Sequence, residues 1–139
     1  VGALVVCGLV AAVCAGSAAA AGDVLAQGNL PGTFGLRFGP DGNLYVASVI
    51  GLNITVMDTE NGVISERLEQ DMQIKGPDDL VFGPDGSLYW TDILVGEVGR
   101  MAPDGSITKQ FVAPGVNPIA FSDDGRLFVA LCFLGDGLY

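Results

Sequence analysis

The sequence predicts an all-β protein of the β-propeller class, because a fourteen-residue phrase recurs three times along the 139-residue chain. The copies are GLRFGPDGNLYVAS (35–48), DLVFGPDGSLYWTD (79–92) and PIAFSDDGRLFVAL (118–131). Their turn aspartates, Asp41, Asp85 and Asp124, recur at intervals of 44 and 39 residues, a period typical of propeller blades. Each phrase holds short apolar runs without helical spacing, which excludes helix-pair solenoids. A two-sheet sandwich is the alternative, but it would not need this repeat.

Each phrase is expected to form a β-hairpin. In the first copy Pro40 pre-sets φ, Asp41 can accept hydrogen bonds from its own backbone, and Gly42 supplies the positive φ that closes the turn. A second hairpin is predicted after each complete phrase, at 53–68 and 97–112. Two hairpins per period make four strands, which is one blade.

The runs LYVA, LYWT and LFVAL are apolar on both faces, as expected for inner strands between stacked blades. Trp90 and the aligned aromatics Tyr45, Tyr89 and Phe128 are expected to pack between blades. Asp92 is expected to bond a neighbouring turn. The outer hairpins carry the charged residues expected at an exposed rim: Asp58, Glu60, Glu66, Arg67, Arg100 and Lys109.

The repeats amount to about two and a half four-stranded blades, whereas propellers close with four to eight. The chain begins with Val1 and ends at Tyr139, where the second hairpin of the third blade should start. We therefore expect residues 22–139 to be the N-terminal part of a longer propeller.

Residues 1–22 carry no charge and end in small residues with an Ala-x-Ala cleavage pattern near Ala21. This segment predicts a signal peptide at 1–21 and a secreted or periplasmic protein. The alternative is a membrane anchor formed by an uncleaved segment. Membrane association is expected only in that case.

The composition limits the chemistry. The net charge of −10 disfavours nucleic-acid binding. Cys132 stands alone in an inner strand and is expected to be a buried, inert thiol. The chain has no histidine, so these residues cannot assemble a Ser-His-Asp relay or an imidazole-rich zinc site. What remains is carboxylate and amide oxygen, which can hold Ca²⁺ or Mg²⁺.

The register of the repeats predicts where such oxygens lie. Seven residues before each turn aspartate lie Phe34, Asp78 and Asn117, each at the start of an inner strand. In a propeller these starts converge on one mouth of the central channel. Asp78 and Asn117 are therefore candidate ligands from adjacent blades, and Phe34 is an expected apolar wall. Alternatively, Asp78 and Asn117 cap the strands through side-chain to backbone bonds.

The segments GPDDLVFGPDGSLYWTD and GVNPIAFSDDGRLFVAL resemble consecutive blades of the regucalcin and gluconolactonase (senescence marker protein) family. The resemblance covers residues 33–139. Its most specific parts are Pro-Asp-Asp at 77–79, where the family usually has Pro-Asn-Asp, and Asn117 ahead of an apolar run ending in Ser122. The family consists of six-bladed propellers that bind one divalent cation and hydrolyse lactones, so the resemblance implies six blades in the whole protein.

The resemblance implies that Asn117 is a metal ligand and that Asp78 contacts metal or substrate. Phe34 departs from the pattern, since the family has a glutamate ligand there, and Pro118 replaces the usual glycine. The family's catalytic aspartate would lie beyond Tyr139. Loss of a carboxylate ligand can weaken a calcium site, so whether Phe34 abolishes metal binding stays open.

The function that this resemblance implies is a divalent-metal-dependent hydrolase of a sugar or other small lactone, with Ca²⁺ the first choice of cation and Mg²⁺, Mn²⁺ or Zn²⁺ as alternatives. Two other functions remain open. The stretch LYWTDILVGEVGRMAPDGSITKQF also resembles streptogramin-lyase propellers, which use a histidine. The third possibility is a non-catalytic secreted propeller that binds a protein or glycan.

Overall fold

The computed structural model describes residues 25–26, 28–133 and 135–139, and within them every element except one short 3-10 helix is a β-strand. The predicted leader therefore lies outside the described residues. The elements are β1 (Thr33–Phe38), β2 (Leu44–Ser48), β3 (Asn53–Met57), β4 (Ile64–Leu68), η2 (Gln70–Met72), β5 (Pro77–Phe82), β6 (Leu88–Asp92), β7 (Glu97–Met101), β8 (Ile107–Phe111), β9 (Val116–Phe121) and β10 (Leu127–Leu131).

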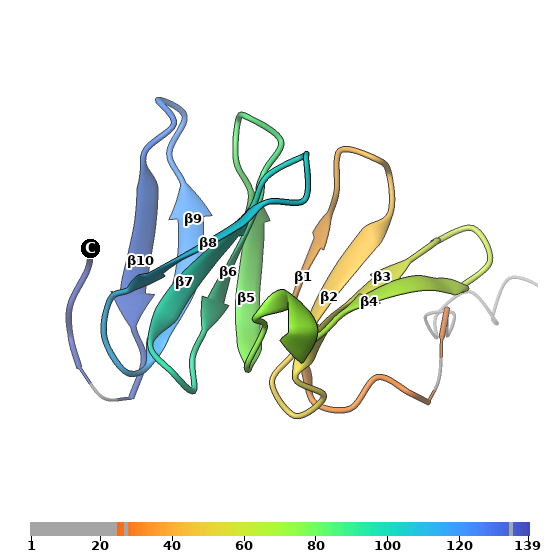
Figure 1. Cartoon of the computed structure of the whole chain (residues 1–139), viewed down its shortest axis with the longest axis horizontal. Helices are drawn as coiled ribbons and strands as arrows, with labels where there is room; N and C mark the ends of the chain where they lie inside the picture. The colour runs from red at the N-terminus through yellow and green to blue at the C-terminus, as the bar shows by residue number, and fades with distance from the viewer. Residues whose placement is uncertain (1–24, 27, 134) are drawn as a thin grey trace, which may run out of the picture.

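The strands form three antiparallel sheets in chain order (Figure 1): β1-β2-β3-β4, β5-β6-β7-β8 and the pair β9-β10. Leu138 adds a bridge to Ala130 at the outer side of the last pair. The expected two and a half four-stranded blades are thus confirmed, and both predicted outer hairpins form, as β3-β4 and β7-β8.

The turn chemistry predicted for the inner hairpins is present. In the first turn the amide of Gly39 donates to the carbonyl of Asn43 over 2.8 Å, and Gly42 has φ of 83°. The Asp41 carboxylate accepts the amide of Asn43 over 3.1 Å. Because such bonds are local, they fix the register of the hairpin without help from other sheets.

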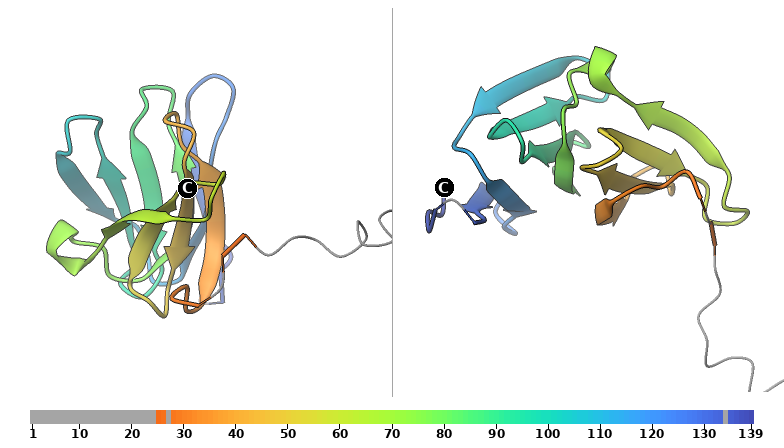
Figure 2. Two further views of the ribbon diagram at one scale, coloured as in Figure 1. Left: turned by 90° about the vertical axis from the view of Figure 1, so that its right-hand side faces the viewer. Right: turned by 90° about the horizontal axis from the view of Figure 1, so that it is seen from below.

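The sheets are fanned along an arc, with the outer strands on its convex side (Figure 2, right). The inner strand β5 contacts both β1 and β9. The first residues of these three strands therefore lie around one side of the arc, where the channel of a propeller runs.

The main hydrophobic core fills the space between the first two sheets. Ile54 and Ala47 of the first sheet pack there with Leu80 and Trp90 of the second, and all four are fully buried. Burying side chains of this size contributes about 1.5–3 kcal/mol each. The predicted packing role of Trp90 is confirmed.

Asp92 is fully buried at the end of β6 and bonds the segment that leads into β5, as expected. Its carboxylate accepts the backbone amides of Lys75 and Gly76, each over 3.0 Å, and the indole N–H of Trp90 over 3.2 Å. It also forms an ion pair with Lys109 of β8. The prediction that Lys109 lies on an exposed rim is wrong, since its side chain is nearly buried.

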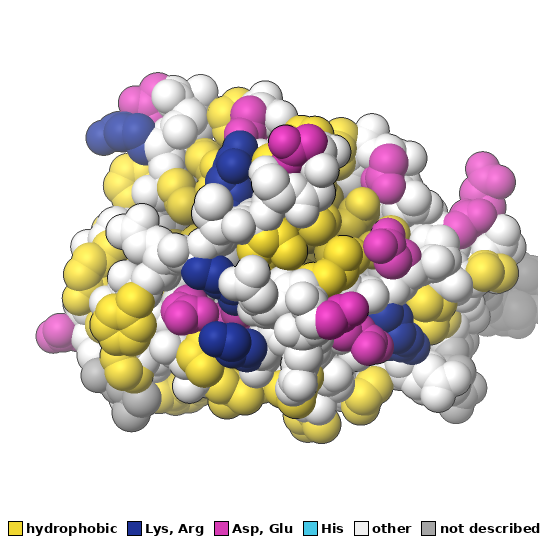
Figure 3. Space-filling model, in the orientation of Figure 1, with side chains coloured by type: hydrophobic (Ala, Val, Ile, Leu, Met, Phe, Trp, Pro, Cys, Tyr) yellow, Lys and Arg dark blue, Asp and Glu magenta, His cyan; other side chains and the backbone are white. Residues whose placement is uncertain are grey.

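The reason is the strand partner of Lys109. Gly99 lies opposite it across β7 and β8, so no side chain blocks the route inward. The ammonium group then lies 4.9 Å from the centre of the Trp90 ring, a favourable cation–π distance. The other basic and acidic side chains of the outer strands do reach the surface, and both kinds are visible over this face in Figure 3.

Candidate functional site

A β-bulge interrupts each of the three inner strands at the same place. The regular pairing breaks between Thr33 and Leu36 in β1 and between Pro77 and Leu80 in β5. In β9 it breaks between Val116 and Ile119, whose partners in β10 are Leu131 and Val129. Each bulge places two residues opposite one on the partner strand, and bulges of this kind re-aim side chains.

The residues predicted from the seven-residue offset are the first residues of these bulges: Phe34, Asp78 and Asn117. They occupy equivalent positions in neighbouring sheets, as the repeat predicts.

The structure brings two of them into direct contact. The side-chain nitrogen Nδ2 of Asn117 donates to Oδ1 of Asp78 over 3.0 Å, from one sheet to the next. Asp78 is only 9% exposed. The amide oxygen Oδ1 of Asn117 is buried and has no hydrogen-bond partner. An unsatisfied buried acceptor is costly, so this oxygen is suited to a ligand that supplies the missing partner.

The structure assigns the capping role to Asp79, a residue that the sequence reasoning did not single out. Its Oδ2 accepts the amide of Ile119 from the next sheet over 3.1 Å, and its Oδ1 accepts the amide of Leu80 over 2.9 Å. Thr91 also accepts the Asp79 amide over 3.1 Å. Asp79 therefore fixes the bulge, whereas Asp78 meets the side chain of Asn117. The two adjacent aspartates in the sequence, Asp78 and Asp79, could have indicated that one of the two carboxylates binds the backbone.

The pKa of the Asp78 carboxyl is raised by its surroundings. Burial raises its pKa above the ordinary value of 3.8, the charge of Asp79 raises it further, and the bond from Asn117 partly offsets both effects. A cation beside the carboxylate would reverse this cost, because an opposite charge favours the ionised form.

Phe34 lies at the third equivalent position and brings no oxygen. Its side chain is 56% exposed, which agrees with an accessible apolar surface on β1. Within the described residues no group of three or more His, Cys, Asp or Glu side chains is placed to hold a metal ion. The side chains able to hold a cation at this place are therefore Asp78 and Asn117, one charged and one neutral ligand.

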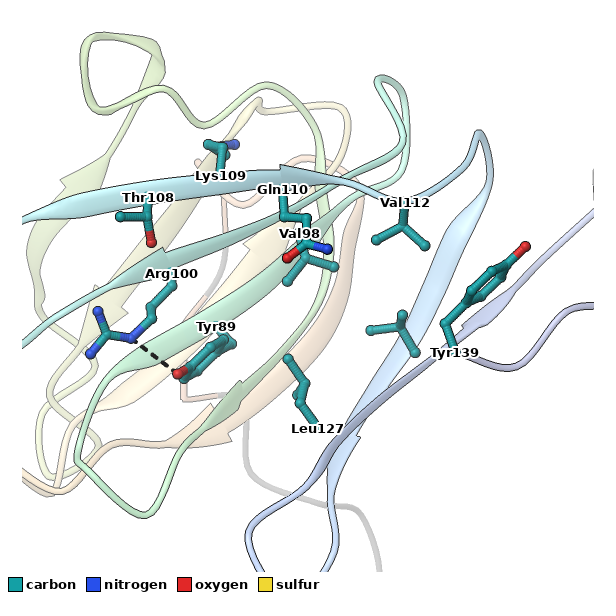
Figure 4. A pocket seen from close by; sticks show the side chains of 10 residues that line it. Tyr89, Val98, Arg100, Thr108, Lys109, Gln110, Val112, Leu127 and Tyr139 are labelled. Carbon is teal, nitrogen blue, oxygen red and sulfur yellow. Dashed lines mark hydrogen bonds between the residues drawn. The ribbon is translucent and has the colours of Figure 1, made fainter.

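A separate pocket lies away from Asp78 and Asn117. It has a volume of about 470 Å³ and lies between β7-β8 and β10, with Tyr89, Val98, Arg100 and Leu127 in its walls (Figure 4). Val129, which also lines it, stands at the strand position that Trp90 occupies in the second sheet. No carboxylate lines it, so it does not suit a cation.

Among the described residues, no helix is both long and apolar enough to cross a membrane.

Comparison with known proteins confirms the propeller fold. The chain is similar to the virginiamycin B lyase of Staphylococcus aureus, solved as a catalytically inactive variant with quinupristin (TM-score 0.61, 23% identity over 70% of this chain). It is similar to hydrazine synthase of Kuenenia stuttgartiensis, with a TM-score of 0.62 and 23% identity over 79% of this chain. It is also similar to a periplasmic gluconolactonase of Pseudomonas aeruginosa, with a TM-score of 0.57 and 21% identity over 70% of this chain. Both enzyme classes that the sequence resembles are thus among the proteins that share its fold.

The chain spans about a third of these three proteins, with 34%, 33% and 33% of their lengths covered. No protein-family model matches the chain, and no curated protein sequence matches it. At identities this low the likeness shows the fold, and one fold serves many functions.

Proposed function

We propose that this chain is part of a propeller that binds a divalent cation in its channel and hydrolyses a small lactone. The observation that carries the proposal is the contact between Asp78 and Asn117, which leaves a buried amide oxygen without a partner. Carboxylate and amide oxygens are the ligands that hard cations such as Ca²⁺ and Mg²⁺ prefer. The gluconolactonase among the similar structures supports the substrate class.

In this proposal each residue has a distinct role. Asp78 supplies the negative charge, and Asn117 supplies the neutral oxygen Oδ1 while its Nδ2 holds the Asp78 carboxylate in place. Asp79 keeps the bulge in register by binding the backbone of the next sheet. A bound cation would polarise the lactone carbonyl and lower the pKa of a water molecule. The general base would come from a blade outside the described residues.

Phe34 distinguishes this site from one with three oxygen ligands. Its exposed ring lies at the position equivalent to Asp78 and Asn117, so it offers the substrate an apolar contact. We expect the preferred lactone to carry an apolar substituent that packs on this ring. Export through the leader at 1–21 belongs to the same proposal, since a secreted or periplasmic hydrolase would meet such small molecules outside the cytoplasm.

The test is cation binding and lactone hydrolysis by the complete propeller, with the blades expected beyond Tyr139, after removal of metals with a chelator. We expect added Ca²⁺ to bind and to start hydrolysis of gluconolactone or an alkyl-substituted lactone. Asn117→Leu and Asp78→Ala should each weaken cation binding about tenfold or more. Asn61→Ala, in an exposed turn, is the matched control and should change neither property.

Two outcomes would contradict the proposal in different ways. Absence of any binding of Ca²⁺, Mg²⁺, Mn²⁺ or Zn²⁺ would remove the metal site. Cation binding without turnover of any lactone would remove the hydrolase activity and favour a non-catalytic binding propeller.

A further inference from the structure

The second sheet holds an arginine side chain against a tyrosine and the aspartate of its inner turn. Arg100 of β7 donates from Nε to the hydroxyl oxygen of Tyr89 over 3.0 Å (Figure 4) and from a terminal nitrogen to Oδ2 of Asp85 over 2.8 Å. Tyr89 packs edge to face on Phe121 of the third sheet, with ring centres 5.1 Å apart. One guanidinium group thus neutralises the turn aspartate of this sheet.

The first sheet repeats the tyrosine and the aspartate but not the arginine. The hydroxyl of Tyr45 donates to Oδ2 of Asp41 over 3.2 Å. Val56 pairs with Tyr45 across β2 and β3, whereas Arg100 pairs with Tyr89 in the second sheet. Among the described residues Asp41 forms no ion pair with a lysine or arginine. The first sheet therefore presents the same two oxygen groups without a cation beside them.

A pocket of about 250 Å³ lies beside these two groups, between the turns β1-β2, β5-β6 and β7-β8 at the top of Figure 1. Asp41 and Tyr45 line it on the side of the first sheet, and Phe82, Met101 and Pro103 line it on the side of the second. Tyr45 meets Phe82 edge to face at 5.0 Å, so the expected packing of Tyr45 between blades is confirmed. The pocket combines one carboxylate with apolar walls.

This pocket belongs to two complete sheets. Both sheets have all four strands, and every residue that lines the pocket lies in them or in their turns. The pocket is also remote from the proposed cation site, because Phe82 ends β5 whereas Asp78 lies near its start. A ligand in the pocket would leave the channel side free.

The charges around the pocket favour a positive ligand. Burial raises the pKa of Asp41, but hydrogen bonds from Asn43 and Tyr45 outweigh it, so the pKa lies below 3.8 and the carboxylate is charged at neutral pH. Burial raises the pKa of Tyr45 to about 12, together with the charge and hydrogen bond of Asp41 and the charge of Glu66. Tyr45 therefore stays neutral, and its oxygen can accept a hydrogen bond beside two carboxylates.

We propose that this pocket binds a small alkylguanidinium compound. Its guanidinium group takes the place that Arg100 fills in the second sheet, with one N–H donated to the Tyr45 hydroxyl and another to the Asp41 carboxylate. Its alkyl chain packs on Phe82 and Met101. A guanidinium group suits two separate acceptors better than an ammonium group does, because its donors form a rigid planar fork. The pocket is smaller than the roughly 300–1,000 Å³ of drug-sized sites, so the ligand is small.

The test is calorimetric titration of n-butylguanidinium into the complete propeller, with the blades expected beyond Tyr139. We expect binding at pH 7, and n-butylurea, a neutral compound of similar shape, should bind at least tenfold more weakly. Asp41→Asn should weaken butylguanidinium binding about tenfold or more, since a hydrogen bond to a charged group is lost. Asp124→Asn removes the same charge at the equivalent turn of the third sheet and should leave binding unchanged.

A second measurement locates the ligand. The NMR signal of the Met101 methyl group, assigned with Met101→Leu, should shift during the titration, because Met101 lines the pocket. The Asp41 variant should not show this shift. Asn at position 41 can still accept the amide of Asn43 as Asp41 does, so the variant should fold, which circular dichroism checks.

Three outcomes would overturn the proposal. The first is equal binding of butylguanidinium by the parent and the Asp41→Asn variant, and the second is an unchanged Met101 signal at saturation. The third is tighter binding of a blocked Gly-Arg-Gly peptide than of butylguanidinium, which would assign the pocket to an arginine of another polypeptide instead of a free compound.

Discussion

At the scale of single residues, Asp78 is a carboxylate whose ionisation opposes folding. Its pKa in the folded chain is raised above 3.8 by burial and by Asp79. A raised carboxyl pKa means that the folded state binds the proton more tightly than the unfolded state. The stability of the fold therefore falls as pH rises through the interval between the unfolded and folded pKa values, and the loss persists above it.

Asp78→Asn should remove this dependence. We expect the variant to be more stable than the parent chain at pH 7 without cation, and the difference between the two to vanish below pH 3.8. Urea unfolding of both chains over a pH series measures this. Asp104→Asn is the control with the opposite sign, because hydrogen bonds from Ser106 lower the pKa of Asp104. Equal pH dependence of the parent and the Asp78 variant would show that Asp78 is not desolvated.

Asp92 has a structural role, and replacing its buried carboxylate should lower the stability of the fold. Asp92→Asn would remove the closer charged partner of the nearly buried Lys109 ammonium group and leave it only the longer ion pair with Glu97, at 3.8 Å. Breaking a buried ion pair on one side costs about 3–5 kcal/mol, so we expect chemical denaturation to show a loss of that order. Asp124→Asn removes an exposed partner of Arg126 and should change stability very little. Similar losses in the two variants would contradict this account of Asp92.

At the scale of strands, the sequence predicts what depends on local chemistry. Both kinds of hairpin and their order in each sheet follow from Asp-Gly and Asn-Gly turns, whose bonds lie within a few residues. The bulges were not predicted, because an extra residue in one strand has no mark of its own in the sequence. The seven-residue offset still located them, since each inner strand carries the same bulge.

Contacts between sheets were harder to predict than contacts within them. The bond from Asn117 to Asp78 joins residues 39 apart in the sequence, and the bond to Asp79 joins residues 40 apart. The convergence of Asp78 and Asn117 could be predicted from the repeat. Which of the two aspartates binds the backbone could not, because this depends on how the bulge turns each side chain. The burial of Lys109 depended in the same way on its strand partner, Gly99.

Gly99 itself shows how closely the strands of the second sheet pack. A Cβ atom added there would lie 2.2 Å from the Trp90 indole. Gly99→Ala should therefore destabilise the fold by about 1–3 kcal/mol through overpacking, as measured by thermal or urea unfolding. Combining it with Trp90→Phe, which leaves space, should cost less than the sum of the two single changes. Strict additivity would show that the glycine and the indole do not compete for space.

At the scale of the whole molecule, three sheets share one junction geometry and one channel-side position. The arc (Figure 2) has β1 at one end and the β9-β10 pair at the other. We expect six blades in the complete ring, as the family resemblance implies. On the channel side, side chains from separate sheets meet and leave the Asn117 amide oxygen without a hydrogen-bond partner.

The central claim is that Asp78 and Asn117 hold a divalent cation, and anomalous X-ray diffraction from crystals grown with Mn²⁺ tests it most directly. The account predicts one strong anomalous peak within ligand distance, about 2–2.6 Å, of Asn117 Oδ1 and the Asp78 carboxylate. The peak should be lost in Asn117→Leu crystals. A map with no peak beside these two residues, while the channel is open to solvent, would contradict the claim.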